Sequence, residues 1–419
     1  MPELHMSRPQ SFRSESAFRI AWVALAPLRA TTPFQTVAVS FWLIDRGGSF
    51  TQVGLAVALP TFAALVGIVL GGWLTDRSNP LRLLLWQNIV ALCIALTLLL
   101  SGRMEQYSEV AVIATISVYG LVNGLSGPAA RALTPRLLDE SRYNFGNSVY
   151  SSITNLATII GPLFGGVVYS SAGFEWCILA NIGALLFGAI IMFVLSVRTR
   201  TSRVLADGAG EVGFIAGVTA ALKFAVATRW LLVLMGVDAV IDVVTAGLFQ
   251  TGFRALSAPL GGSAVFGVVM AAYGIGAIAG AWAAGQSRGW GLKAFAVVMV
   301  ANIGQAPLIA VLPIVDVGPM LFMLVWVGAL NGYANVVYMS FVFSRIPASM
   351  AGRVSSLLMA ASLSLQPVGI ACFGAIVDVI GVVNLFLVCA GVLLVVSVVA
   401  LVLWRGIKSQ LRLEVTDGQ

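Results

Sequence analysis

Charged residues are scarce in this chain. Asp, Glu, Lys and Arg together make up 10% of its 419 residues, whereas hydrophobic residues make up 59% and the mean hydropathy is +0.96. A single soluble core cannot bury that much apolar surface. The composition therefore excludes a soluble globular protein and predicts a protein that uses lipid as its solvent.

Histidine and paired cysteines are missing from the apolar part of the chain. The only histidine is His5 in the polar N-terminal tail, and the four cysteines stand singly inside apolar runs. The apolar part thus holds neither the usual general base nor a cysteine spacing typical of a disulfide or metal site. We expect no metal and no cofactor. A membrane-embedded enzyme is the alternative class, which activity of the purified protein without a gradient would reveal.

The apolar residues fall into twelve runs of about 20 residues, the length that crosses a bilayer as a helix. These runs are 17–44, 51–75, 82–101, 109–130, 146–170, 174–196, 229–253, 262–285, 292–312, 318–342, 352–376 and 382–404. The sequence predicts an all-α membrane protein of twelve transmembrane helices. It divides into an N-terminal tail 1–16, a six-helix bundle 17–196, a linker 197–228, a second six-helix bundle 229–404 and a tail 405–419.

The basic residues predict the orientation of these helices. Twenty of the 24 Lys and Arg residues lie in the two tails and the even-numbered connections, which include the linker, or within the first three residues of the run that follows them. The odd-numbered connections hold only Arg46, Arg103 and Arg254. Because Lys and Arg mark cytoplasmic segments, we expect both termini and the linker to be cytoplasmic. This topology explains the net charge of +7, which implies no nucleic-acid partner.

The two predicted bundles carry similar short motifs. Gly71-Gly72-Trp73 and Gly280-Ala281-Trp282 are separated by 209 residues, and Asn123-Gly124 and Asn331-Gly332 by 208 residues. Matches in the same order at nearly one offset indicate duplicated, pseudo-symmetric halves.

The segment between the second and third runs carries a family resemblance. Gly72-Trp73-Leu74-Thr75-Asp76-Arg77-Ser78-Asn79-Pro80-Leu81-Arg82 resembles the Gly-x-x-x-Asp-Arg-x-x-x-x-Arg signature of the major facilitator superfamily. The resemblance implies a conformational latch made by Gly72, Asp76, Arg77, Arg82 and Arg131. In this latch Asp76 would sit at the N-terminus of the eleventh helix, near Gly352, and pair with a basic residue such as Arg131. A carboxylate is favourable at a helix N-terminus.

Two further segments resemble exporters of this superfamily. Gly161-Pro162-Leu163-Phe164-Gly165-Gly166 looks like the core of the antiporter signature, although Ala157 and Ser148 replace two of its other glycines. These residues would kink the helix and allow a neighbour to approach closely. An ordinary kinked packing helix is the alternative. Segments 127–138 and 352–356 are similar to the branch that contains enterobactin exporters and macrolide efflux pumps, but Gly120 stands where antiporter relatives often have an Arg.

Three charged residues lie deep inside predicted helices. Arg29 follows Arg19 by ten residues, or about 15 Å along a helix, and Asp238 and Asp242 follow Arg229 by about 13 and 20 Å. Charges near the bilayer midplane are functional candidates. The two aspartates share a helix face, and double ionisation of such a close pair is disfavoured, so one of them could carry a coupling proton. The alternative is a static ion pair between Arg29 and the aspartates.

Other polar and aromatic residues are candidates for a substrate cavity. They are Gln35, Tyr119, Asn123, Asn155, Tyr273, Trp326, Asn331, Tyr333, Asn335, Tyr338 and Gln366. Aromatic and amide groups suit an amphipathic substrate.

The sequence therefore predicts a proton-coupled secondary active exporter (antiporter). It would move an amphipathic organic molecule, either a drug-like compound or a siderophore-like metabolite, by alternating access. The resemblance implies a monomer in the bacterial cytoplasmic (inner) membrane. An importer or lysophospholipid transporter of the same fold, and coupling to sodium, are the alternatives.

Overall fold

All regular structure in the computed structural model is helical among the residues that it describes, which are 13–102, 108–198, 228–287, 291–346 and 348–417. Helices suit lipid, because each satisfies its own backbone hydrogen bonds. Residues 1–12 of the predicted N-terminal tail, 199–227 of the predicted linker and 418–419 of the C-terminal tail lie outside the described residues.

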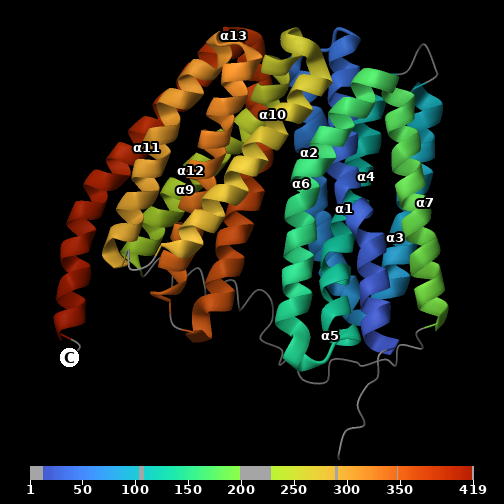
Figure 1. The fold of residues 1–419 in the computed structure, drawn as a ribbon, viewed down its shortest axis with the longest axis horizontal. Helices are drawn as coiled ribbons and strands as arrows, with labels where there is room; N and C mark the ends of the chain where they lie inside the picture. Colours follow the sequence, from blue (N-terminus) through green and yellow to red (C-terminus); the bar gives the residue numbers. More distant parts are fainter. Residues whose placement is uncertain (1–12, 103–107, 199–227, 288–290, 347, 418–419) are drawn as a thin grey trace, which may run out of the picture. The chain divides into compact units, whose positions relative to one another are not determined.

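The first half of the chain forms six long helices and two short ones (Figure 1). They are α1 (Arg13–Asp45), α2 (Phe50–Arg77), α3 (Pro80–Gly102), α4 (Glu109–Arg131), α5 (Leu133–Leu137), the 3-10 turn η1 (Glu140–Arg142), α6 (Tyr143–Ala172) and α7 (Phe174–Arg198).

The second half begins with α9 and continues without a break into a π-helical turn. Its elements are α9 (Arg229–Gly247), the π turn η2 (Leu248–Gly252), α10 (Phe253–Gln286), η3 (Gly291–Lys293), α11 (Ala294–Val311), η4 (Leu312–Ile314), α12 (Val317–Phe343) and α13 (Ala348–Asp417).

Nine helical ranges in the described part of the chain are long and apolar enough to cross a membrane. The two longest are Trp230–Gln286 with 57 residues and Ser362–Trp404 with 43 residues. A crossing needs only about 20 residues, so each of these ranges is long enough for two. Both contain glycines with non-helical torsions, Gly261 (φ 129°) and Gly262 (φ 66°) in the first and Gly381 (φ 79°) in the second. The chain is an all-α membrane protein, while the number twelve stays a prediction.

One predicted helix boundary was wrong, and it concerns Arg254. The sequence placed this residue in the connection after a helix that ended at residue 253, but the helical path continues through η2 into α10 as far as Gly261. Arg254 is only 2% exposed, and its guanidinium lies over the Phe266 ring at 4.6 Å. It also donates a hydrogen bond to the backbone oxygen of Gln250.

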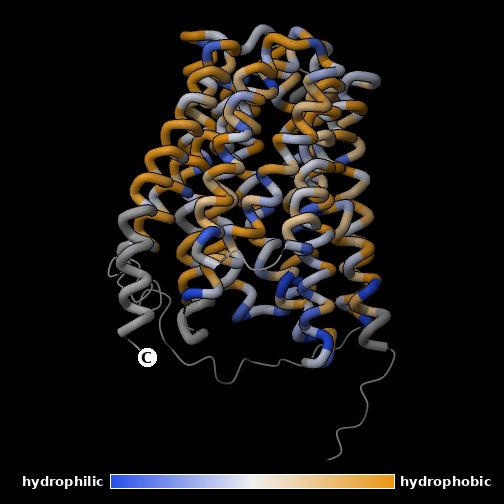
Figure 2. The backbone as a smooth tube through the Cα atoms, turned by 60° about the vertical axis from the view of Figure 1, so that its left-hand side comes forward, coloured by the Kyte–Doolittle hydropathy of each residue, from blue (hydrophilic) through white to orange (hydrophobic). Residues whose placement is uncertain are grey.

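The chain forms two compact units. The first unit comprises Met1–Gln35, Phe62–Gly161 and Ala172–Ala209, and the second comprises Thr36–Thr61, Pro162–Ser171 and Gly210–Gln419. Each unit has its own apolar core, for example around Trp22, Leu84 and Leu133 in the first and around Phe253, Phe266 and Phe386 in the second. Figure 2 shows hydrophobic residues along most of the length of the helices. Large apolar side chains such as Trp282, which is 70% exposed, are left to face lipid.

Glycine allows the backbones of α10 and α12 to touch. A Cβ atom added at Gly276 or Gly280 would lie 2.0 or 1.9 Å from a carbonyl oxygen of α12, and one added at Gly328 or Gly332 would lie 2.1 Å from a carbonyl oxygen of α10. Only glycine fits such an approach.

The same close backbone contact through glycines, here called a glycine seam, occurs in the first unit between α2 and α4. There a Cβ atom added at Gly67 would lie 2.1 Å from the Leu121 oxygen, and one added at Gly124 would lie 2.2 Å from the Ala64 oxygen. The offset of 208 to 209 residues noted in the sequence therefore corresponds to one packing device used in both halves. Gly120 is buried one turn before Gly124, on the face that packs against α2.

Candidate functional site

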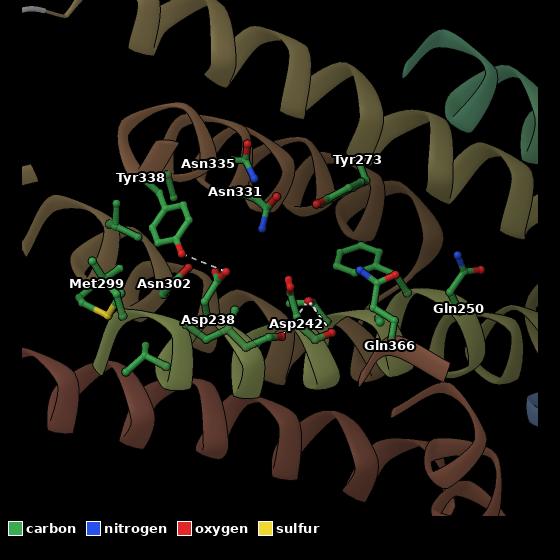
Figure 3. A pocket seen from close by; sticks show the side chains of 18 residues that line it. Asp238, Asp242, Gln250, Tyr273, Met299, Asn302, Asn331, Asn335, Tyr338 and Gln366 are labelled. Atoms are coloured by element: carbon green, nitrogen blue, oxygen red, sulfur yellow. Dashed lines mark hydrogen bonds between the residues drawn. The ribbon is translucent and has the colours of Figure 1, made fainter. Parts of the chain in front are cut away.

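The second unit contains a cavity of about 300 Å³ between α9, η2, α10, α11, α12 and α13 (Figure 3). Its lining is mixed, with two carboxylates, several amides, two tyrosines and apolar side chains. The residues are Leu234, Val237, Asp238, Ile241, Asp242, Thr245, Ala246, Phe249, Gln250, Tyr273, Val298, Met299, Asn302, Asn331, Ala334, Asn335, Tyr338 and Gln366.

The two aspartates lie on the wall that α9 contributes. This helix contains no proline, and its regular 3.6-residue turn places Asp238 and Asp242 on the same face. Both carboxylates point from α9 toward the cavity in Figure 3. The hydroxyl of Tyr338 on α12 donates a hydrogen bond to Asp238 Oδ2 at 3.2 Å.

Asp242 is bound differently from Asp238. Its backbone oxygen accepts a hydrogen bond of 3.3 Å from Thr245 Oγ1. Its carboxylate, in contrast, has no hydrogen-bond partner in the part of the chain that the structure describes. One aspartate is thus held by a tyrosine, and the other presents free acceptor oxygens to the cavity.

Amide side chains from α11, α12 and α13 form the rest of the polar wall. Asn331 and Asn335 point into the cavity from α12, and Gln366 reaches it from α13 (Figure 3). Asn302 on α11 is 5% exposed and accepts a hydrogen bond of 3.1 Å from Gln305 Nε2. Amides both donate and accept, so this wall can bind either kind of polar group.

The other end of the cavity is aromatic. The rings of Phe249 and Tyr273 are in contact at a tilt of 42° with their centroids 4.2 Å apart, and the Phe253 ring lies beyond them at 5.1 Å from Phe249. The π-helical turn η2 carries both Phe249 and Gln250. A π turn shifts the residues that follow it around the helix axis, which is a common feature of functional sites.

Arg29 belongs to the first unit, where α4 and α6 hold its guanidinium. Nη1 donates to Ser126 Oγ at 3.3 Å, Nη2 donates to the Ser126 backbone oxygen at 3.2 Å, and the group lies 5.4 Å from the Tyr150 ring centre. Its Nε is buried with no hydrogen-bond partner among the described residues.

Three predicted cavity residues of the first unit lie in a buried polar network. Asn181 Nδ2 donates to Gln35 Oε1 at 2.5 Å, and the Tyr119 hydroxyl donates to Asn181 Oδ1 at 3.3 Å. Asn123 Nδ2 donates to the Tyr119 backbone oxygen at 3.2 Å and its Oδ1 accepts from Gln87 Nε2 at 3.4 Å. These bonds tie α1, α3, α4 and α7 together.

A family model described as Major Facilitator Superfamily matches residues 21–370. The chain belongs to the major facilitator superfamily. The family predicted from the segment 72–82 is therefore confirmed, and the protein is a membrane transporter by family.

Curated relatives of this superfamily member include named exporters. The chain is 24% identical over 376 residues to the enterobactin exporter EntS of Salmonella choleraesuis, covering 87% of this chain and 86% of the relative. It is also 24% identical over 389 residues to the multidrug efflux pump Tap of Mycolicibacterium fortuitum, covering 88% and 91%.

Solved transporter structures have the same fold. The nucleoside transporter NupG matches with a TM-score of 0.71 at 11% identity, covering 92% of this chain and 99% of that one. A POT family peptide transporter matches with a TM-score of 0.69 at 12% identity, covering 93% and 96%.

The superfamily segment begins at the end of α2, and its Asp76 has an electrostatic partner in α5. Burial lowers the pKa of Arg136, and the charge of Asp76 opposes this effect, which places the two groups near each other. Arg131 instead lies 4.9 Å from the Tyr150 ring centre, and Arg77 lies 4.4 Å from the Trp73 ring centre. Arg82 is exposed, and a Cβ atom added at Gly72 would meet nothing within 4 Å.

The antiporter-like motif of this transporter lies in α6 and makes close contacts in both units. A Cβ atom added at Gly161 would lie 2.6 Å from Pro33 Cγ in the first unit, and one added at Gly166 would lie 2.1 Å from the Ser263 oxygen in the second. The Ser263 hydroxyl donates to the Gly166 oxygen at 3.0 Å. Pro162 and Gly165 are buried beside them.

The remaining predicted cavity residues lie elsewhere. Asn155 is exposed on α6, Trp326 is 54% exposed on α12, and the Tyr333 hydroxyl donates to Ser287 Oγ at 3.2 Å. None of the three lines the cavity of the second unit.

Sequence reasoning missed several residues that do line the cavity. Asn302 is a polar residue in an apolar run, a signal that could have been used. Thr245 lies in α9, three residues after Asp242 and on the same face, so the helical period could have indicated it. Phe249 and Gln250 carried no such signal, because they lie in the π turn.

Proposed function

We propose that this transporter is a proton-coupled antiporter that exports an amphipathic organic molecule by alternating access. The observation that carries the proposal is the pair Asp238 and Asp242 on one wall of a cavity of about 300 Å³. The transporter would lie in the bacterial cytoplasmic membrane, with both termini cytoplasmic, and work as a monomer.

Proton coupling follows from the physics of this pair. Two carboxylates one helical turn apart disfavour double ionisation, so one of them holds a proton while the other is charged. A substrate that changes the net charge in the cavity also changes how tightly the aspartate pair holds this proton. Binding and proton release are then linked, as antiport requires.

The lining supports an amphipathic substrate. The contacting rings of Phe249 and Tyr273 give one end of the cavity an apolar surface, and Asn331, Asn335 and Gln366 give the rest hydrogen-bonding groups. Export is supported by two of the relatives, the enterobactin exporter EntS and the multidrug efflux pump Tap. An importer or lysophospholipid transporter remains the alternative function for this fold.

Everted membrane vesicles test both coupling and direction. Respiration acidifies their lumen, which quenches a weak-base dye, and an exporter that exchanges its substrate for protons restores the fluorescence. Ethidium, chloramphenicol and novobiocin give a panel of cationic, neutral and anionic probes. We expect recovery with at least one probe, and a loss of at least tenfold in its rate for Asp238→Asn and Asp242→Asn.

The matched control is Asp316→Asn, which changes an exposed aspartate at the start of α12, outside the cavity. Its recovery rate should equal that of the unmodified protein. Exchange that proceeds equally well in the Asp238 and Asp242 variants would refute proton coupling by this pair. Gradient-driven uptake of a probe into intact cells would instead show an importer.

A further inference from the structure

The charge of the cavity lining is all of one sign. Of its 18 residues, two are aspartates and none is Lys, Arg or His among the described residues. The other titratable groups that face the aspartates are Tyr273 and Tyr338, which are neutral near pH 7. Within the described part of the chain, nothing on the cavity wall neutralises a second carboxylate.

The two aspartates are not equivalent as acceptors. Tyr338 donates to Asp238 at 3.2 Å, whereas the carboxylate of Asp242 has no hydrogen-bond partner in the described part of the chain. Figure 3 shows Asp242 pointing into the open space between α9 and α12, with Asn331 opposite. An unpaired charge inside a membrane protein is costly unless a proton or a cation compensates it.

We propose that Asp242 is the counter-charge for an organic cation, an ammonium or phosphonium group with an aromatic or apolar body. The cation pairs with Asp242, and its body lies against Phe249 and Tyr273, whose contacting rings line the same cavity. Ring faces attract cations, and the rings also cover apolar surface. When the cation neutralises Asp242, Asp238 releases the coupling proton, because the hydrogen bond that Tyr338 donates stabilises the charged form of Asp238.

This inference rests on the proposed function and narrows its substrate class. An anion would enter a cavity whose described lining carries two carboxylates and no basic group, and like charges at this range repel. The cavity volume of about 300 Å³ lies at the lower end of the range for small-molecule sites, which suits a compact organic cation.

Tetraphenylphosphonium and tetraphenylborate provide the test, because the two ions have nearly the same size and shape and opposite charge. Their binding to the full-length purified protein is measured by equilibrium dialysis at pH 8, against protein-free micelles and without a gradient. We expect the phosphonium ion to bind at least tenfold more tightly than the borate. Asp242→Asn should weaken phosphonium binding at least tenfold, which corresponds to about 1.4 kcal/mol.

Three variants keep the test decisive if Asp242→Asn folds poorly. Asp242→Glu preserves the charge and should bind the phosphonium ion within about fivefold of the unmodified protein. Asp238→Asn should bind it within about threefold and yet lose gradient-driven exchange, and Asp316→Asn should change neither. Size-exclusion chromatography establishes that each variant is folded.

The outcomes separate this inference from the proposed function. Equal binding of the two ions, no phosphonium binding, or unchanged binding in Asp242→Asn would overturn the cation site, even if the vesicles exchange another probe for protons. Charge-selective binding that depends on Asp242 would support the site, even if the vesicles show no proton exchange.

Discussion

The glycine seam between α10 and α12 offers a sharp test of the packing that shapes the cavity. In Gly280→Ala the new Cβ atom would lie 1.9 Å from the Ala329 oxygen, more than 1 Å inside the 3.0 Å limit below which something must shift. The obstacle is backbone, so the two helices have to separate. Tyr273 on α10 would then move relative to Asn331 and Tyr338 on α12.

The expected change in the unfolding free energy of Gly280→Ala is the sum of two opposing effects. Overpacking typically costs about 1–3 kcal/mol of unfolding free energy. Replacing a helical glycine by alanine returns about 0.5–1 kcal/mol through helix propensity. Gly285→Ala on the same helix isolates the second effect, because its Cβ atom would meet nothing within 4 Å.

Thermal unfolding of the two purified variants gives the measurement. For soluble domains of about 150–250 residues, 1 kcal/mol shifts Tm by about 2–4 °C. We therefore expect Gly280→Ala to melt on the order of 5 °C below Gly285→Ala. Its export rate should also fall, while that of Gly285→Ala stays normal. Equal melting temperatures for the two variants would refute the close contact of α10 with α12.

Three further predictions concern parts of the chain away from the cavity. Asp378 accepts hydrogen bonds from the backbone nitrogens of Phe50 and Thr51 at 2.9 and 2.8 Å, so Asp378→Asn should loosen the start of α2 from α13. The probe is a cysteine in place of buried Val57, in a background without native cysteines. It should react several times faster with a water-soluble maleimide when Asp378→Asn is added. An unchanged rate would show that Asp378 does not hold α2 against α13. Asp76→Asn should leave membrane abundance near normal and slow export, because it removes a charge contact at the surface rather than core packing; normal export would show that the contact is dispensable. Single cysteines in the linker 197–228 should react only with reagents that enter the cytoplasm, and labelling from outside intact cells would overturn the orientation.

The sequence by itself determined the fold class and the position of the aspartate pair. Long apolar runs can only be membrane helices, since lipid offers no partner for unpaired backbone groups. Asp238 and Asp242 share a face whatever surrounds them, because four residues are about one turn of any α-helix. The repeated glycines at 71 and 280, and at 124 and 332, were also visible, and the seams explain their offset.

Helix boundaries were harder to predict. Apolar residues continue on both sides of Arg254, so hydropathy does not indicate that this charge lies within the helical path. The helical path is instead interrupted at Gly261 and Gly262. Their positive φ angles are conformations that glycine adopts readily, and hydropathy does not reveal them.

Only the tertiary structure decided which polar residues face the cavity. Trp326 and Asn331 both belong to α12, yet Trp326 is 54% exposed and Asn331 lines the cavity with Asp238. In a soluble protein the polar face of a helix would reveal this rotation. In a membrane the outer face is as apolar as the core, so hydropathy carries no rotational signal, and backbone contact between helices sets the rotation instead.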